Sequence, residues 1–183
     1  MPIVNVSLLE GYDDFARGEL LRRLTDAVRL SINAPLDSIT VVLSEVPPSD
    51  YRRGGRKHHA GAGKESPEAL VRDFQTALKQ GSLDLAETYT DKDFTVVYPS
   101  GKSASLREFA AWSATQFRDI AKDYAHFDEA VLEDGSVAVY CGGTLVGQSK
   151  DRTSFDGIPF IEHYVVREGK LIEKRLWTDV GGR

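Results

Sequence analysis

Residues 2–9 have the sequence Pro-Ile-Val-Asn-Val-Ser-Leu-Leu and open a strand, helix and strand pattern that decides the fold of the first third of the chain. Their β-branched and leucine residues predict a strand. In residues 15–32, leucine, alanine and valine recur at three- and four-residue spacing opposite an arginine-bearing face, which predicts an amphipathic helix. Residues 39–43 predict a second strand. The helical connection makes the two strands parallel, so we expect a βαβ unit.

A glycine-rich segment without hydrophobic periodicity, residues 52–64, follows this unit. Charge and aromatic content differ on its two sides. Residues 1–60 are balanced, with eight Lys and Arg and eight Asp and Glu, whereas residues 61–183 carry fifteen and twenty. We therefore expect two domains, at residues 1–57 and 66–183, joined by a linker at residues 58–65.

The first domain resembles a known family in several short motifs. They are Pro2 after the initiator Met, Leu9-Glu10-Gly11, Asn33-Ala34-Pro35-Leu36, Ser44-Glu45-Val46, and Tyr51 before Gly54-Gly55. These motifs resemble the 4-oxalocrotonate tautomerase family over residues 2–57. The resemblance implies a catalytic N-terminal proline that moves a proton between oxygen and carbon of an enol, within a trimer of dimers.

Pro2 suits this chemistry for a physical reason. A free α-amino group has a pKa of roughly 7.7 to 8.0, and burial in an apolar pocket disfavours its charged form. A proline amine can therefore act as a general base near neutral pH. Met1 must first be removed, because otherwise the Pro2 nitrogen is an amide without basicity.

The sequence departs from the family at the substrate-binding positions. The two arginines that bind a dicarboxylate in the founding enzymes would fall at Tyr12 and Thr40, and neither residue is charged. The aromatic pocket wall would be Tyr51. Arg53, next to Arg52, is the candidate for a substitute cation, because a guanidinium binds a carboxylate through two hydrogen bonds.

The second domain has helices first and strands after them, an α+β pattern. Ser66-Pro67-Glu68 begins one helix, Ser82 a short one, and the capping box of Ser105 and Glu108 a third, expected to carry Phe109, Trp112, Phe117 and Ile120. Four strands with turns at Asp134-Gly135 and Glu168-Gly169 follow. This order resembles the SnoaL-like and nuclear-transport-factor-2-like cone fold over residues 66–180. We expect three helices over one face of a curved antiparallel sheet.

The last hairpin predicts which residues face the cone. A two-residue turn at Glu168-Gly169 would place Tyr164 opposite Glu173 and Glu162 opposite Arg175 as an ion pair. The expected pocket residues are Tyr98, Trp112, Glu162, Tyr164, Arg175 and Trp177. In the ketosteroid isomerase branch of this fold the base would fall at Tyr98 and the phenol donor at Phe74, so the resemblance argues against that reaction.

Composition limits the partners and the location. The net charge of -5 argues against a nucleic acid or an anionic membrane. With one cysteine, Cys141, and with His58-His59 supplying only two ligands of an incomplete site, we expect no metal site and no cofactor. No apolar run reaches the roughly 20 residues of a membrane span, so we expect a cytoplasmic protein. A lone βαβ unit has open sheet edges, so we expect a homo-oligomer, a hexamer first and a dimer second.

Two functions of different class remain open. In the first, Pro2 is the general acid/base for keto-enol chemistry on a small unsaturated acid or ketone, and the second domain binds substrate or drives assembly. In the second, Tyr12 and Thr40 mark a lost active site. The chain would then be a small-molecule binding protein, or a SnoaL-like isomerase or cyclase acting from the aromatic cavity.

Overall fold

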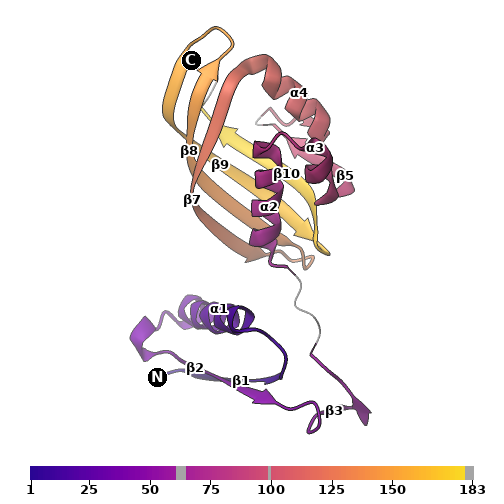
Figure 1. The fold of residues 1–183 in the computed structure, drawn as a ribbon. Helices are drawn as coiled ribbons and strands as arrows, with labels where there is room; N and C mark the ends of the chain where they lie inside the picture. Colours follow the sequence, from indigo (N-terminus) through magenta and orange to yellow (C-terminus); the bar gives the residue numbers. More distant parts are fainter. Residues whose placement is uncertain (61–64, 99, 180–183) are drawn as a thin grey trace. The chain divides into compact units, whose positions relative to one another are not determined.

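The computed structural model describes residues 1–60, 65–98 and 100–179, which form two compact units that divide between Lys64 and Glu65. Figure 1 shows a small unit at the N-terminus and a larger unit of helices over a sheet. Residues 61–64 of the expected linker lie outside the described residues. None of the described helices combines the length and apolar character that crossing a bilayer requires.

The first unit is a βαβ unit, as expected. Strand β1 (Ile3–Leu9) lies parallel to β2 (Thr40–Val46), with Ile3 opposite Thr40 and Leu9 opposite Val46. Helix α1 (Asp14–Ile32) connects them, and a 3-10 turn, η1 (Leu36–Ser38), precedes β2. The carboxylate of Asp13 accepts a hydrogen bond from the Ala16 amide at 2.8 Å and so caps α1.

A small hairpin follows β2. Strands β3 (Arg52–Arg53) and β4 (Arg56–Lys57) are antiparallel, and their turn is Gly54-Gly55. Both glycines have positive φ, 58° and 76°, the backbone of a tight hairpin turn that other residues adopt only with strain.

The first unit buries little in a single copy. Each of residues 1–60 is at least partly exposed to solvent. Among them are Ile3 and Val42 on the sheet and Leu30 on the helix. Burial of apolar surface is the main stabilising term in folding, so this unit needs a further surface to cover it.

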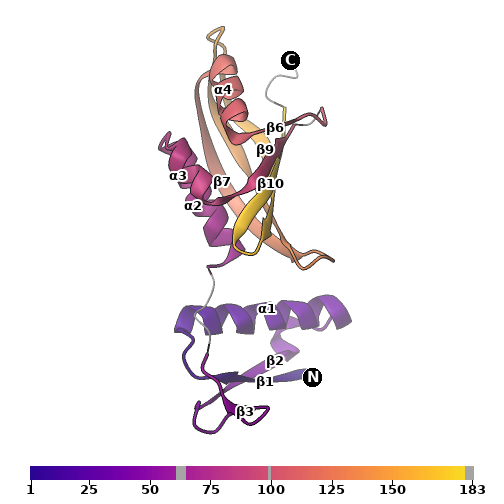
Figure 2. The same ribbon diagram turned by 90° about the vertical axis from the view of Figure 1, so that its right-hand side faces the viewer.

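The second unit places three helices on one face of a six-stranded sheet (Figures 1 and 2). The helices are α2 (Pro67–Lys79), α3 (Leu83–Thr88) and α4 (Leu106–Gln116). The strands are β5 (Thr90–Val97), β6 (Ser103–Ala104), β7 (Phe117–Val131), β8 (Val137–Ser149), β9 (Ser154–Arg167) and β10 (Lys170–Thr178). This arrangement confirms the expected α+β cone.

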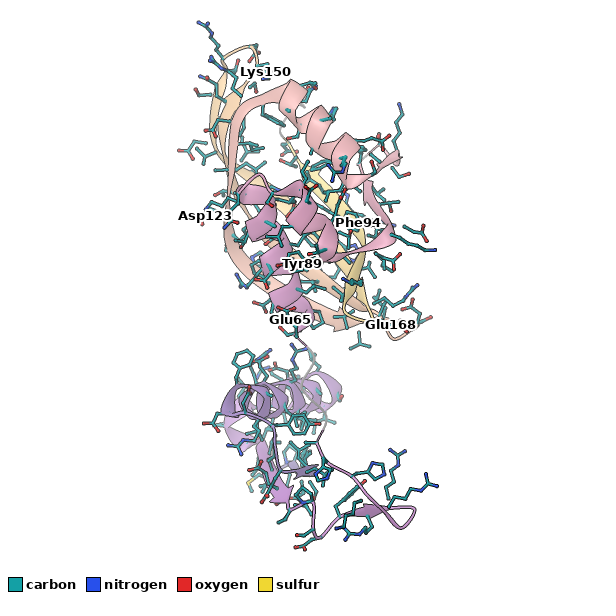
Figure 3. The ribbon with its side chains drawn as sticks, turned by 45° about the vertical axis from the view of Figure 1, so that its right-hand side comes forward. Glu65, Tyr89, Phe94, Asp123, Lys150 and Glu168 are labelled. Carbon is teal, nitrogen blue, oxygen red and sulfur yellow. The ribbon has the colours of Figure 1, made fainter. Side chains whose placement is uncertain are left out.

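The sheet order is β6-β5-β10-β9-β8-β7. Strands β7 to β10 form an antiparallel meander, and the labelled turn residues Lys150 and Glu168 mark the two ends of β9 in Figure 3. Strand β5 pairs with β10 in parallel, so the sheet is mixed rather than wholly antiparallel. The core lies between helices and sheet, where Phe74 of α2 contacts the rings of Phe94 and Tyr164.

The third helix is shorter than expected. The capping box of Ser105 and Glu108 starts α4 as predicted, but the helix ends at Gln116 because Phe117 has extended backbone and begins β7. Phe117 and Ile120 therefore belong to the sheet. They still face the helices, since both line the cavity described below.

Candidate functional site

Pro2 lies at the start of the first unit, next to the strand pair. Its carbonyl accepts a hydrogen bond from the Thr40 amide at 3.0 Å, which fixes the entry of the chain into β1. The side chain is half-buried, while Met1 is 87% exposed. Removal of Met1 would leave a secondary amine beside Thr40, at the end of the sheet where β1 and β2 both begin.

The other predicted residues of this site are not all near Pro2. Thr40 is adjacent to Pro2. Tyr12 follows the far end of β1, and at about 3.3 Å per residue this end lies more than about 20 Å from Pro2. Tyr51 contacts the ring of His58 edge-on, and Arg53 is exposed on the hairpin. Figure 1 shows that hairpin away from the N-terminus. A single chain therefore brings together only Pro2 and Thr40.

The second unit contains a cavity of about 610 Å³ between its helices and its sheet. Its walls come from α2, α3, α4, β7, β8 and β10 and are mostly apolar, with several polar and basic groups. The apolar residues are Leu78, Leu83, Leu106, Phe109, Ala110, Trp112, Phe117, Ile120, Ala121, Leu145 and Leu176.

A buried carboxylate, Glu162, lies next to this cavity on β9. It is fully buried, and four side chains contact its two oxygens closely. Oε1 accepts from the ammonium groups of Lys122 and Lys174, the latter at 2.8 Å. Oε2 accepts from the hydroxyls of Tyr124 at 3.0 Å and Tyr164 at 2.9 Å. We call these five residues the Glu162 cluster.

Burial and charge shift the pKa values of the cluster in opposite directions. Burial opposes ionisation of Glu162, but the two ammonium groups outweigh it and hold the pKa of this carboxyl well below its usual range. Burial lowers the pKa of Lys174 to about 8, although Glu162 attracts its proton. Burial, with the nearby Glu162 charge, raises the pKa values of Tyr124 and Tyr164, so both stay hydroxyl donors. With the carboxyl and both lysines in their charged forms, the cluster combines one negative charge with two positive charges.

The expected ion pair between Glu162 and Arg175 is wrong. A β-bulge between Leu171 and Glu173 shifts the register of β10 by one residue, so Glu173 lies opposite Val165 and Leu176 opposite Glu162. Such a shift reverses which face each side chain occupies. Lys174 points inward to Glu162, and Arg175 points outward to Glu173, with a 2.7 Å ion pair.

The remaining pocket predictions have mixed outcomes. Trp112 lines the cavity. Tyr98 contacts the ring of Trp112 at 5.2 Å but is not among the lining residues, and Tyr164 lies behind the wall, fully buried in the Glu162 cluster. Trp177, expected on the concave face, is 44% exposed and pairs with Ile161 on the outer face because of the same register shift.

Sequence reasoning missed Lys122, Lys174, Tyr124 and the α2 residue Gln75, whose amide is 3.4 Å from Glu162 Oε2. One sequence signal could have identified Lys174. A glutamate inside an apolar strand needs a positive partner, and β10 carries Lys174 and Arg175 at adjacent positions. Which of the two faces Glu162 depends on the register of the strand pair. Among the described residues, no group of three or more His, Cys, Asp and Glu side chains is placed to hold a metal ion.

The N-terminal part of the chain is similar to known tautomerases. Residues 2–61 match the model of the tautomerase enzyme family. A 2-hydroxymuconate tautomerase from Stutzerimonas stutzeri is 36% identical over 72 residues, which are 39% of this chain and all of that protein. One from Pseudomonas putida is 33% identical over the same length and coverage.

The second unit is similar to solved structures in fold alone. An NTF2-like protein from Burkholderia pseudomallei has a TM-score of 0.54 at 14% identity, covering 62% of this chain and 90% of that one. TerC, crystallised with polyporic acid, has a TM-score of 0.52 at 18% identity, covering 62% and 91%. These matches confirm the NTF2-like cone.

Proposed function

Because the chain belongs to the tautomerase family, we propose that it is a keto-enol tautomerase in which the amine of Pro2, freed by removal of Met1, is the general acid/base. The observation that carries the proposal is the match of residues 2–61, which begins at this proline. The family supports an isomerase-type activity. The proton mechanism and the substrate are our proposals.

The proposed reaction moves one proton. The Pro2 amine takes the proton of an enol hydroxyl and delivers it to carbon, so an O–H bond breaks, a C–H bond forms and a ketone results. No electrons are exchanged with a cofactor. A free α-amino group ordinarily has a pKa of roughly 7.7 to 8.0, so near neutral pH it can both take up and release the proton.

The substrate class follows from the residues proposed to surround Pro2. Thr40 and Tyr12 carry no charge, so a substrate with one carboxylate, or with none, suits this site better than a dicarboxylate. Arg53 lies on the exposed hairpin and Tyr51 directly precedes it, and together they could supply a cation and an apolar wall to the Pro2 of another copy. We propose that the site is completed by oligomerisation, with a hexamer favoured and a dimer second.

For the second unit we propose a substrate-binding or assembly role. The 610 Å³ cavity favours ligand binding, since small-molecule sites are concave, mostly apolar and of this size. This observation also favours the second candidate, a chain that only binds a small molecule, or a SnoaL-like isomerase or cyclase acting from this cavity. The uncharged Tyr12 and Thr40 are consistent with that candidate.

The test is enol turnover by the full chain. With Met1 removed, verified by intact mass, the protein should ketonise an aryl enol-pyruvate such as phenylenolpyruvate. Pro2→Ala should abolish the enzymatic rate, and Pro67→Ala, the same change at the first residue of α2, should leave it intact. Full activity of methionine-free Pro2→Ala would refute the role of Pro2 and leave the binding-protein candidate.

A further inference from the structure

The cavity of the second unit has an excess of positive charge. Four basic residues line it, namely Arg72, Lys79, Lys122 and Lys174, and none of the described lining residues is acidic. Arg72 forms an ion pair with Glu68 on the same helix. Lys122 and Lys174 share a single carboxylate, so the Glu162 cluster leaves one positive charge uncompensated at the cavity wall.

The two lysines differ in how they meet the cavity. The side chain of Lys174 is 1% exposed, and its ammonium lies 5.2 Å from the ring centre of Phe109 and 5.3 Å from that of Tyr164. These rings and Glu162 together stabilise its charge. Lys122 is 23% exposed, and Glu162 is its one described charged partner. An ammonium has three donors, so Lys122 retains donors for a ligand.

Glu162 itself has no capacity left for a ligand. Both of its oxygens already accept two close hydrogen bonds, and the carboxylate is fully buried behind the residues that line the cavity. Its role is therefore to hold the two ammonium groups in place. A ligand entering the cavity meets Lys122 rather than the carboxylate.

The chemistry of the walls complements this charged end. The cavity that Lys122 lines also presents Trp112, Phe109, Phe117 and Ile120, a surface for a flat hydrocarbon group. A positive charge with few surrounding waters is best neutralised by an anion, and the one uncompensated charge of the Glu162 cluster matches one carboxylate or enolate.

We propose that this cavity binds a small organic monoanion, with its carboxylate or enolate on Lys122 and its aromatic or aliphatic part against Trp112 and Phe109. The proposal rests on the ligand-binding role suggested for the second unit and is independent of catalysis by Pro2. Metal cations and basic compounds are disfavoured by the same excess charge.

The test compares two probes of equal shape, 3-phenylpropionate and its neutral amide, 3-phenylpropanamide. Binding to the full chain is measured by calorimetry and by tryptophan fluorescence in a Trp177→Phe background, where Trp112 is the one tryptophan. The acid should bind about tenfold more tightly than the amide, as expected for a hydrogen bond to a charged group. Trp112 fluorescence should change on binding.

Lys122→Met should remove most of this preference without changing the affinity for the amide. Lys122→Gln, which keeps a donor to Glu162, should do the same and guards against misfolding of the first variant. Lys92→Met, an equal change of charge at an exposed site on β5, is the control and should bind like the parent. Pro2→Ala should also bind like the parent, which separates this proposal from the tautomerase.

Equal affinity of the parent for acid and amide would overturn the proposal. A preference that persists in both Lys122 variants, or no binding of either probe at millimolar concentration, would also overturn it.

Discussion

Replacing Glu162 by glutamine should strongly destabilise the second unit. The amide has nearly the same shape, and its oxygen can still accept from the two lysines while the tyrosine hydroxyls rotate to accept from its NH₂ group. Only the negative charge is lost. Lys174, 1% exposed, would then be a buried ammonium without a counter-ion.

The expected cost is about 3 to 5 kcal/mol, the range for removing one partner of a buried ion pair. The destabilisation has an upper limit, because Lys174 can lose its proton instead of staying buried as an unpaired ammonium. Deprotonating an ordinary lysine at pH 7, about 3.4 pH units below its pKa, requires roughly 1.4 kcal/mol per unit, or about 5 kcal/mol. For a unit of this size the melting temperature should fall by roughly 10 to 20 °C.

Tryptophan fluorescence during urea or thermal unfolding measures this effect selectively, since both tryptophans, Trp112 and Trp177, belong to the second unit. Glu173→Gln, the same change in an exposed pair, is the control and should cost about 1 kcal/mol or less. Adding Lys174→Met to Glu162→Gln should restore part of the stability. A Glu162→Gln protein within about 1 kcal/mol of the parent would refute the assignment of Glu162 as the counter-ion.

Three further predictions concern pH, specificity and assembly. The pKa of Glu162 is lower in the folded than in the unfolded chain, so its stabilising effect is present above about pH 4.5 and is lost as the pH falls below that value. Unfolding followed between pH 6 and 3 should show this loss in the parent and little of it in Glu162→Gln; equal pH profiles would contradict it. Tyr12→Arg combined with Thr40→Arg should improve kcat/KM for dicarboxylate enols more than for monocarboxylates, and equal effects would count against this placement of the missing cations. Light scattering coupled to size exclusion should give six chains per particle; a dimer would mean that one interface is lost, and a concentration-independent monomer would exclude a shared site.

The pH dependence expected for Glu162 reflects the groups around its carboxylate. The titratable or charged groups that face Glu162 are Lys122 and Tyr124 on β7, Cys141 on β8, Tyr164 on β9 and Lys174 on β10.

Much of the fold could be predicted because local signals agreed with the tertiary structure. The periodicity of residues 15–32, the capping box at Ser105 and the turn at Glu168-Gly169 each specify an element through contacts within a few residues. Such short-range signals identified both units.

The site could be predicted only in part because it depends on one residue of register. The bulge after Leu171 involves Ile172, and neither glycine nor proline marks it in the sequence. The bulge places Lys174, instead of Arg175, on the inner face of the sheet. It also moves Trp177 to the outer face. Lys122 was missed for a related reason, since the early end of α4 turns an expected helical segment into strand. Both events are set by packing in the whole sheet.

The central claim is that the free amine of Pro2 carries the reaction, and the state of Met1 tests it most directly. Two preparations of the unaltered chain, one with Met1 retained and one with it removed, can be mixed in known ratios verified by intact mass. The rate of enol ketonisation should rise in proportion to the fraction of chains that begin at Pro2 and should vanish when every chain keeps Met1. Equal activity of the two preparations would contradict the mechanism, because the nitrogen of Pro2 would then be an amide in an active protein.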